Sequence, residues 1–171
     1  LIKALGLITA EIRENSSENK KETLKLIIQE IQENYPESKG EINSMILSSE
    51  KIPITIFTKR LGCLEALCKY LKENMSLSYH KIAEITARND RTIWSSYNKA
   101  ISKQKEPLEI KETSEFIPLS AFSNRKFTIL ESIILYLRGR GLKYSKISEL
   151  LERDQRNIWT INSRISKKLA G

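Results

Sequence analysis

An internal repeat constrains the fold of this chain more than any other feature of its 171 residues. Two similar segments, residues 51–105 and 116–171, follow one another along the sequence. The run IPITIFTKR that begins at Ile52 matches IPLSAFSNR, which begins 65 residues later at Ile117. Self-similarity of this kind indicates two copies of one structural unit.

The match continues through the rest of both segments. LEALCKYL from Leu64 matches LESIILYL from Leu130 at an offset of 66, and RNDRTIW from Arg88 matches RDQRNIW from Arg153 at an offset of 65. The single-residue changes in offset fall between predicted elements, where loops absorb differences in length. The two copies are therefore expected to share one order of secondary-structure elements.

Each copy is predicted to contain an extended arm followed by three helices. Pro53 and Pro118 disfavour helix at the residue before them, which indicates the arms. The side-chain oxygens of Asn89 and Asp154 can accept hydrogen bonds from the first amides of the third helix, so each is the expected N-cap.

Helical periodicity supports the same division. Gly139 and Gly141 mark where the first helix of the second copy should end. The third helices are expected to end near Ser102 and Leu169, with Leu169 on the inner face. The apolar residues that share one face of the first helix are Leu64, Leu67, Cys68 and Leu71 in the first copy, and Leu130, Ile133, Ile134 and Leu137 in the second.

The sequence therefore predicts an all-α fold, in which two tandem three-helix units at residues 51–105 and 116–171 are joined by a linker at 106–115. Residues 1–50 are predicted to be a helical segment, since apolar residues recur there at helical spacing. Packing of this segment on the repeats and pairing with a second subunit in a homodimer are both left open. The chain begins with Leu1 and not Met, which leaves a fragment of a longer protein as an alternative.

Positive charge is concentrated in the repeats. The net charge is +8, divided into −3 for residues 1–50, +5 for residues 51–110 and +6 for residues 111–171. A cationic excess of this kind favours a polyanionic partner such as nucleic acid. A solubilising surface charge is the alternative explanation.

The second and third predicted helices carry the functional signal. A helix, a tight turn and a second helix with polar residues outside form the helix-turn-helix pattern. LSYHKIAEI from Leu77, followed by NDRTI from Asn89, resembles the helix-turn-helix of bacterial sigma factor region four and related transcription regulators. The resemblance covers only these two helices in each copy and implies DNA binding through the third helix. Where those families often have Gly in the turn, this chain has Ala87 and Glu152.

The outward face of the third helix supplies candidate contacts to DNA bases. Arg, Asn and Gln side chains can read base edges in the major groove, and Arg suits guanine. Arg91 and Arg156 occupy matching places and are the best candidates, and Asn157 suits adenine. The predicted base-contacting residues are Asp90, Arg91, Thr92, Ser95, Gln155, Arg156, Asn157 and Thr160.

A second set of residues is predicted to contact DNA phosphates. In known helix-turn-helix proteins the helix before the recognition helix crosses the DNA backbone, and its cations and hydroxyls lie near phosphates. For the two tyrosines, packing is an equal alternative. The predicted phosphate-contacting residues are Tyr79, Lys81, Asn98, Lys99, Tyr144, Lys146, Arg164 and Lys167.

Several other residues are expected to be structural. Trp94 and Trp159 occupy matching places and are expected to pack against the first helix or the arm. The matched Glu84 and Glu149 are expected to orient a neighbouring arginine, and the single histidine, His80, is expected to have no function. Each arm is expected to plug the core of its own copy with a phenylalanine, Phe57 in the first copy and Phe122 in the second, rather than cross to the other copy or a second chain.

The sequence favours a non-enzymatic protein that binds double-stranded DNA, as a cytoplasmic, nucleoid-associated protein or transcription regulator. We expect no metal, cofactor, small-molecule ligand or membrane partner, because the chain has one histidine, no acidic cluster at metal spacing and no glycine-rich phosphate loop. Cys63 and Cys68 are expected to be reduced packing residues. A protein-interaction module is the first alternative. RNA binding is the second, and the lack of predicted exposed aromatic platforms counts against it.

Overall fold

A computed structural model describes Asn34 and residues 50–170. Residues 48–171 form one compact unit. The predicted helical segment and homodimer contacts at residues 1–50 therefore lie outside the described residues, apart from Asn34 and Glu50. No helix among the described residues is long and apolar enough to cross a membrane.

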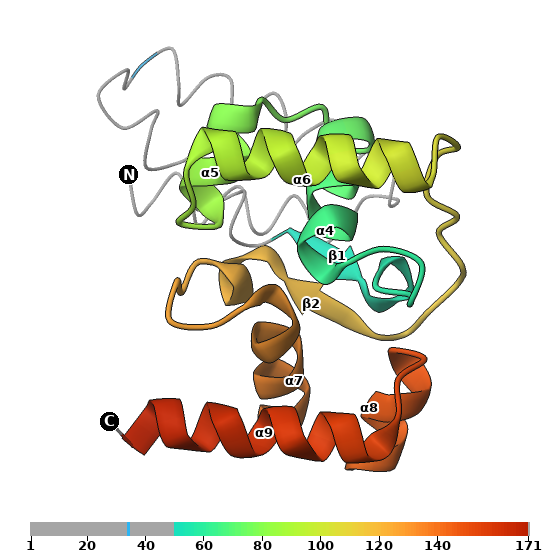
Figure 1. Cartoon of the computed structure of the whole chain (residues 1–171), viewed down its shortest axis with the longest axis vertical. Helices are drawn as coiled ribbons and strands as arrows, with labels where there is room; N and C mark the ends of the chain where they lie inside the picture. The colour runs from blue at the N-terminus through green and yellow to red at the C-terminus, as the bar shows by residue number, and fades with distance from the viewer. Residues whose placement is uncertain (1–33, 35–49, 171) are drawn as a thin grey trace. The chain divides into compact units, whose positions relative to one another are not determined.

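The described chain is mostly helical, and its elements occur twice in the same order (Figure 1). The first copy contains β1 (Lys51–Pro53), the 3-10 helix η2 (Ile54–Ile56), α4 (Cys63–Glu73), α5 (Tyr79–Ile85) and α6 (Asp90–Lys103). The second copy contains β2 (Phe116–Pro118), the 3-10 helix η3 (Leu119–Phe122), α7 (Ile129–Gly139), α8 (Tyr144–Leu150) and α9 (Gln155–Ala170). Residues 104–115, between the copies, contain no helix or strand.

A two-stranded antiparallel sheet joins the copies, which the all-α prediction did not include. Ile52 of β1 lies opposite Ile117 of β2. Because Ile117 is the counterpart of Ile52 in the repeat, each strand meets its own equivalent. A pseudo-two-fold axis therefore passes between these two isoleucines, as it does in the self-complementary interface of a symmetric dimer.

Hydrogen bonds beyond the strands obey the same symmetry. The Ile54 amide donates to the Glu115 carbonyl at 3.1 Å, and the Leu119 amide donates to the Glu50 carbonyl at 2.8 Å. Residues 54 and 119 are counterparts, and so are residues 50 and 115. The two arms thus satisfy the backbone groups of one another, which extended segments near a protein core require.

The phenylalanines of the arms meet across the axis. The rings of Phe57 and Phe122 are both fully buried, with centroids 5.9 Å apart and planes tilted by 51°. The expectation that each arm plugs only its own copy was wrong. Each 3-10 helix does pack on the first helix of its own copy, but η3 also contacts α5 of the other copy. The strand of an arm that stayed on its own copy would leave its backbone N–H and C=O groups unpaired. Pairing with the strand of the other copy satisfies these groups, which favours the shared sheet.

Most of the core of each copy lies where the periodicity placed it, although Leu64 and Leu130 are only half-buried. Leu67 of α4 and Ile134 of α7 are fully buried, as are Ile93 of α6 and Ile158 of α9. Leu169, expected on the inner face, is 59% exposed because it lies in the last turn of α9.

Removal of either ring at the axis should destabilise both copies. We expect Phe57→Ala and Phe122→Ala each to lower the free energy of unfolding by about 3–5 kcal/mol, since each opens a cavity at the junction. Urea unfolding followed by circular dichroism measures the loss. The double variant should lose less than the sum of the two, because the rings contact each other. Strict additivity would contradict the contact.

Candidate nucleic-acid interface

The first turns of α6 and α9 are fixed by the predicted N-caps. Asn89 Oδ1 accepts a hydrogen bond from the Thr92 amide at 2.7 Å. Asp154 Oδ1 accepts from the amides of Arg156 at 2.8 Å and Asn157 at 3.2 Å. The N-cap prediction is confirmed in both copies, so both helices begin at the same place in the repeat.

The turn before each of these helices has the same backbone geometry in both copies. Ala87 has a φ of 50° and Glu152 a φ of 51°, the left-handed region where related turns often have Gly. In the first copy the Arg88 amide donates to the Ala83 carbonyl at 2.8 Å, and the Arg153 amide donates to the Ser148 carbonyl at 3.0 Å in the second. These are the bonds of a Schellman motif, which normally ends a helix with a left-handed residue. The tight turn therefore forms without glycine.

Because a side chain disfavours the left-handed region, glycine should suit these two positions better. We expect Ala87→Gly and Glu152→Gly each to raise the free energy of unfolding by about 0.5–1 kcal/mol, after the larger unfolded-state entropy of glycine is subtracted. Ala100→Gly is the control, since Ala100 lies buried inside α6 and its replacement should cost about 1 kcal/mol or more. Urea unfolding of the three variants checks the signs. Destabilisation at both turn positions would contradict the described geometry.

The predicted arginines point away from the core. Arg91 and Arg156 are exposed, as are Asp90 and Gln155 beside them. Neither arginine forms an ion pair in the described part of the chain. Both guanidinium groups are therefore accessible to a partner.

Some predicted contacts are engaged within the protein. The Thr92 hydroxyl donates to Asn89 Oδ1 at 2.7 Å, and the Thr160 hydroxyl donates to the Arg156 carbonyl at 2.9 Å. The Asn98 side-chain amide donates to the Trp94 carbonyl at 3.0 Å. These groups support the helix itself, so their capacity for a partner is smaller. The remaining predicted residues of α6 and α9 are half-buried or exposed: Ser95, Lys99, Asn157, Arg164 and Lys167.

The two tryptophans are exposed, contrary to the packing expectation. Trp94 is 56% exposed and Trp159 is 57% exposed. Each follows a buried isoleucine, and one helical residue turns the side chain by about 100° away from the core. The sequence did contain a signal for this exposure. In both copies the tryptophan directly follows an isoleucine that helical periodicity places in the core, so the tryptophan has to point away from it.

The lysines of the second helices are paired with glutamates. Lys81 Nζ lies 2.8 Å from Glu84 Oε2 in α5, and Lys146 Nζ lies 3.0 Å from Glu149 Oε1 in α8. The expectation that these glutamates orient an arginine was wrong, since a spacing of three residues places each beside the lysine of its own helix. The hydrogen bond and charge of Lys81 lower the pKa of Glu84.

Both tyrosines pack on the neighbouring helix. The Tyr79 ring lies 5.8 Å from that of Tyr97, and the Lys72 ammonium lies 4.8 Å from its centroid. The Tyr144 hydroxyl accepts a hydrogen bond from the Asn162 side chain at 3.1 Å, and Arg138 stacks over its ring. Of the two alternatives for these residues, the structure shows the packing.

The position of His80 gives it a partner. His80 Nδ1 lies 3.2 Å from Asp90 Oδ2, and both side chains are largely exposed. An exposed pair of this kind contributes little to stability. It does link the first turns of α5 and α6, next to Arg91.

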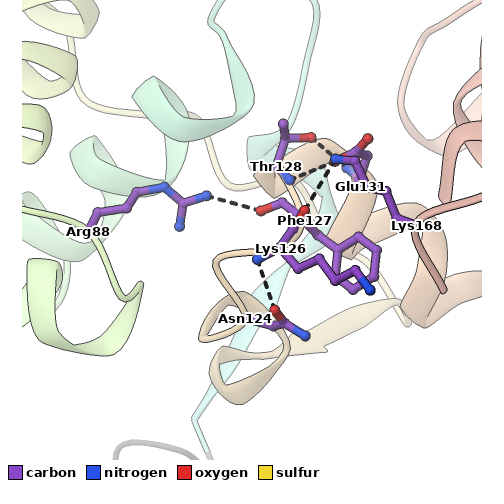
Figure 2. A network of polar contacts seen from close by, with 7 residues as sticks. All are labelled: Arg88, Asn124, Lys126, Phe127, Thr128, Glu131 and Lys168. Atoms are coloured by element: carbon purple, nitrogen blue, oxygen red, sulfur yellow. Dashed lines mark hydrogen bonds and ion pairs between the residues drawn. The ribbon is translucent and has the colours of Figure 1, made fainter. Parts of the chain in front are cut away.

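The last turn of each third helix is bound to the first turn of the first helix. Lys103 Nζ lies 2.8 Å from Glu65 Oε2, and its counterpart Lys168 lies 2.8 Å from Glu131 Oε2 (Figure 2). Burial acts to raise the pKa of Glu131, but hydrogen bonds from Lys168 and the Thr128 amide outweigh it and hold the pKa below its ordinary value. The same balance with Lys103 lowers the pKa of Glu65. These matched pairs fix the third helices against the core.

Two further arginines cross between the copies and were missed in the sequence. Arg88 donates to the Phe127 carbonyl at 3.3 Å (Figure 2). Its counterpart Arg153 lies 3.6 Å from the Cys63 sulfur. Each therefore reaches from the turn of one copy to the start of the first helix in the other. Their place in the repeat was visible, but the crossing was not, because it depends on the pairing of the arms.

The cysteines are free and buried, as expected. Burial raises the pKa of both thiols, that of Cys68 to about 12. A thiol of this kind is unreactive because the thiolate is the nucleophile. No group of His, Cys, Asp and Glu that could hold a metal ion occurs among the residues that the structure describes.

Comparison with protein-family models, with curated proteins and with solved structures found no match to this chain.

Proposed function

We propose that this chain binds double-stranded DNA, with α6 and α9 as the recognition helices of two helix-turn-helix units. The observation that carries the proposal is the matched exposure of Arg91 and Arg156 at the starts of two helices that are capped at equivalent positions. Short polar side chains and arginines at the start of a helix suit the edges of bases in the major groove. A role as a transcription regulator or nucleoid-associated protein follows from this activity.

The arrangement of the copies supports the proposal. In Figure 1, α6 and α9 run in opposite directions on either side of the paired strands. Symmetric dimers of helix-turn-helix proteins present their recognition helices in this relation, about 34–36 Å apart in successive major grooves. The internal pseudo-two-fold axis supplies that symmetry within one chain. Asp90 and Thr92 correspond to Gln155 and Asn157, so the two half-sites should differ in sequence.

Removal of both arginines should weaken DNA binding and reduce its sequence specificity. For Arg91→Ala with Arg156→Ala, we expect specific affinity to fall by about 1–3 kcal/mol per site and the slope of log affinity against log salt to fall by about 1 per cation. Selection from random duplexes followed by binding measurements at several salt concentrations tests this. Arg60→Ala is the matched control, since Arg60 is exposed but lies outside both helices. Affinity that ignores salt and both arginines would contradict DNA binding.

A protein partner is the second candidate, and the exposed tryptophans favour it. Tryptophan and arginine dominate the binding energy of many protein interfaces. The exposed tryptophans also remove the reason given against RNA, namely the lack of exposed aromatic platforms. The concentrated positive charge still favours a nucleic acid over a protein, and the paired symmetry of α6 and α9 favours a duplex over a single strand.

The two tryptophans allow these candidates to be separated. They are the only two in the chain, and both lie on the proposed recognition helices. We expect a cognate duplex to change tryptophan emission and to protect it from iodide quenching, with the effect reversed by salt. Trp94→Ala and Trp159→Ala should leave thermal stability within about 0.5 kcal/mol, because both side chains are largely exposed.

Measurements with different nucleic acids distinguish DNA, RNA and a protein as the partner. Single-stranded RNA that changes the emission more strongly than any selected duplex would favour RNA. If the protein binds DNA but no nucleic acid alters its tryptophan emission, the tryptophans lie outside the DNA interface. They would then be candidates for contact with a protein partner.

A further inference from the structure

A cationic cleft lies between the two copies. It has a volume of about 710 Å³ and is lined by the first turns of α4 and α7, by one side of α6 and by residues 125–127. Six of its lining side chains are cationic and one, Glu65, is acidic, so the net charge of the lining is +5. The cationic residues are Arg88, Lys99, Arg125, Lys126, Arg153 and Lys168.

Carboxylates do not neutralise this charge. Of the six cations, Lys168 alone is ion-paired within the described part of the chain. Arg88 donates to the carbonyls of Thr86 at 2.6 Å and Phe127 at 3.3 Å, and Arg125 donates to that of Ala87 at 3.2 Å. Carbonyl oxygens orient these guanidinium groups but carry only partial charge. The like charges therefore repel one another across the cleft.

Burial adds to the cost of this arrangement. The Nε of Arg153 is buried and has no hydrogen-bond partner in the described part of the chain. Burial, and then the charge of Arg125, lower the pKa of Arg88. A buried donor without an acceptor is uncommon and requires an explanation. A ligand that supplies hydrogen-bond acceptors and negative charge would offset both the missing acceptor and the excess of positive charge.

The start of α4 opens on the same cleft. Its N-cap is Gly62, which has no side chain to accept a hydrogen bond from the first turn, whereas its counterpart Thr128 accepts from the Glu131 amide. The N-terminal amides of a helix attract anions, so this end adds to the field of the cations.

The residue that corresponds to Arg125 in the first copy has different surroundings. Arg60, the counterpart of Arg125, lines a smaller hollow of about 300 Å³ with Glu109 and Glu152. The five charged residues there, which include Lys59 and Lys111, give a net charge of +1. Linker residues line this hollow, and one of them, Glu109, supplies one of its two carboxylates. The surroundings of Arg60 therefore lack the excess of positive charge that surrounds Arg125.

We propose that the cleft between the copies binds a phosphate group, held by Arg125, Lys126 and the crossing arginines Arg88 and Arg153. Planar guanidinium groups match phosphate oxygens with two parallel hydrogen bonds, and phosphate carries the charge that the lining lacks. The volume is large enough for several linked phosphates. This site does not depend on the proposed reading of DNA by α6 and α9.

Inorganic pyrophosphate is the probe of choice because it carries the proposed chemistry and no base. At constant ionic strength, set with sodium chloride, we expect saturating pyrophosphate to raise the midpoint of thermal unfolding of the whole chain by about 3 °C or more. The paired variant Arg125→Gln and Lys126→Gln should lose most of this shift. Both side chains are exposed, so the variant should fold, and circular dichroism verifies this.

Arg60→Gln provides the matched control. It removes one positive charge, at the place in the first copy that corresponds to Arg125, and should keep the full shift. A shift in the wild-type protein no larger than chloride produces would overturn the proposal. So would equal shifts in the wild-type protein and the cleft variant. If the paired variant does not fold, the single variant Lys126→Gln answers the same question through a reduced shift.

A second measurement, of duplex binding by the cleft variant, identifies the source of the phosphate. If the cleft variant also weakens duplex binding, with a salt slope smaller by about 1–2, the natural phosphate belongs to a nucleic-acid backbone. If the variant loses only the pyrophosphate shift, the ligand is a free phosphate compound. Failure of Arg91→Ala with Arg156→Ala to affect DNA binding would leave this site intact, so the two proposals can fail separately.

Discussion

The antiparallel pairing of β1 with β2 is the contact on which the arrangement of the two copies depends. Three residues on each side form the pairing, and Ile52 meets its own counterpart Ile117. A register shifted by one residue would turn both isoleucines out of the core, since side chains alternate along a strand. The buried Phe57–Phe122 contact and the two symmetric hydrogen bonds from backbone amides support the same register. The direction of α6 relative to α9 follows from this short sheet and not from any direct contact that we describe between them.

The pairing also explains why Arg88 and Arg153 matter. Each lies one residue beyond the left-handed turn residue of its own copy, where the chain must reverse toward the third helix. Once the arms cross, this place faces the first helix of the other copy, and each arginine reaches it. The same residues therefore serve the turn through their amides and the junction through their side chains. Their side chains bring like charges together with few carboxylates, and this excess of charge is the basis of the proposed phosphate site.

Much of the local structure could be predicted from the sequence. The repeat, the caps Asn89 and Asp154 and the ends of the third helices follow from local hydrogen bonding and periodicity, which act within a few residues. The prediction was wrong where a side chain lies on the boundary between core and solvent, as Trp94 and Trp159 do. It was also wrong for the arms, because a strand needs a partner that only the tertiary structure supplies. The cationic cleft could not have been found, since its residues come from both copies and from at least five separate segments.

A covalent link between the copies has a physical consequence that a homodimer would not share. In a homodimer the counterparts Arg60 and Arg125 would have the same surroundings, whereas here the linker lines the hollow at Arg60 with Gln104, Leu108 and Glu109. Arg125 lies instead in the cleft, whose lining has a net charge of +5. Sequence differences add to this, because Gly62 stands where the second copy has the capping Thr128. The duplication thus preserves the opposed directions of α6 and α9, while equivalent residues such as Arg60 and Arg125 come to lie in different surroundings.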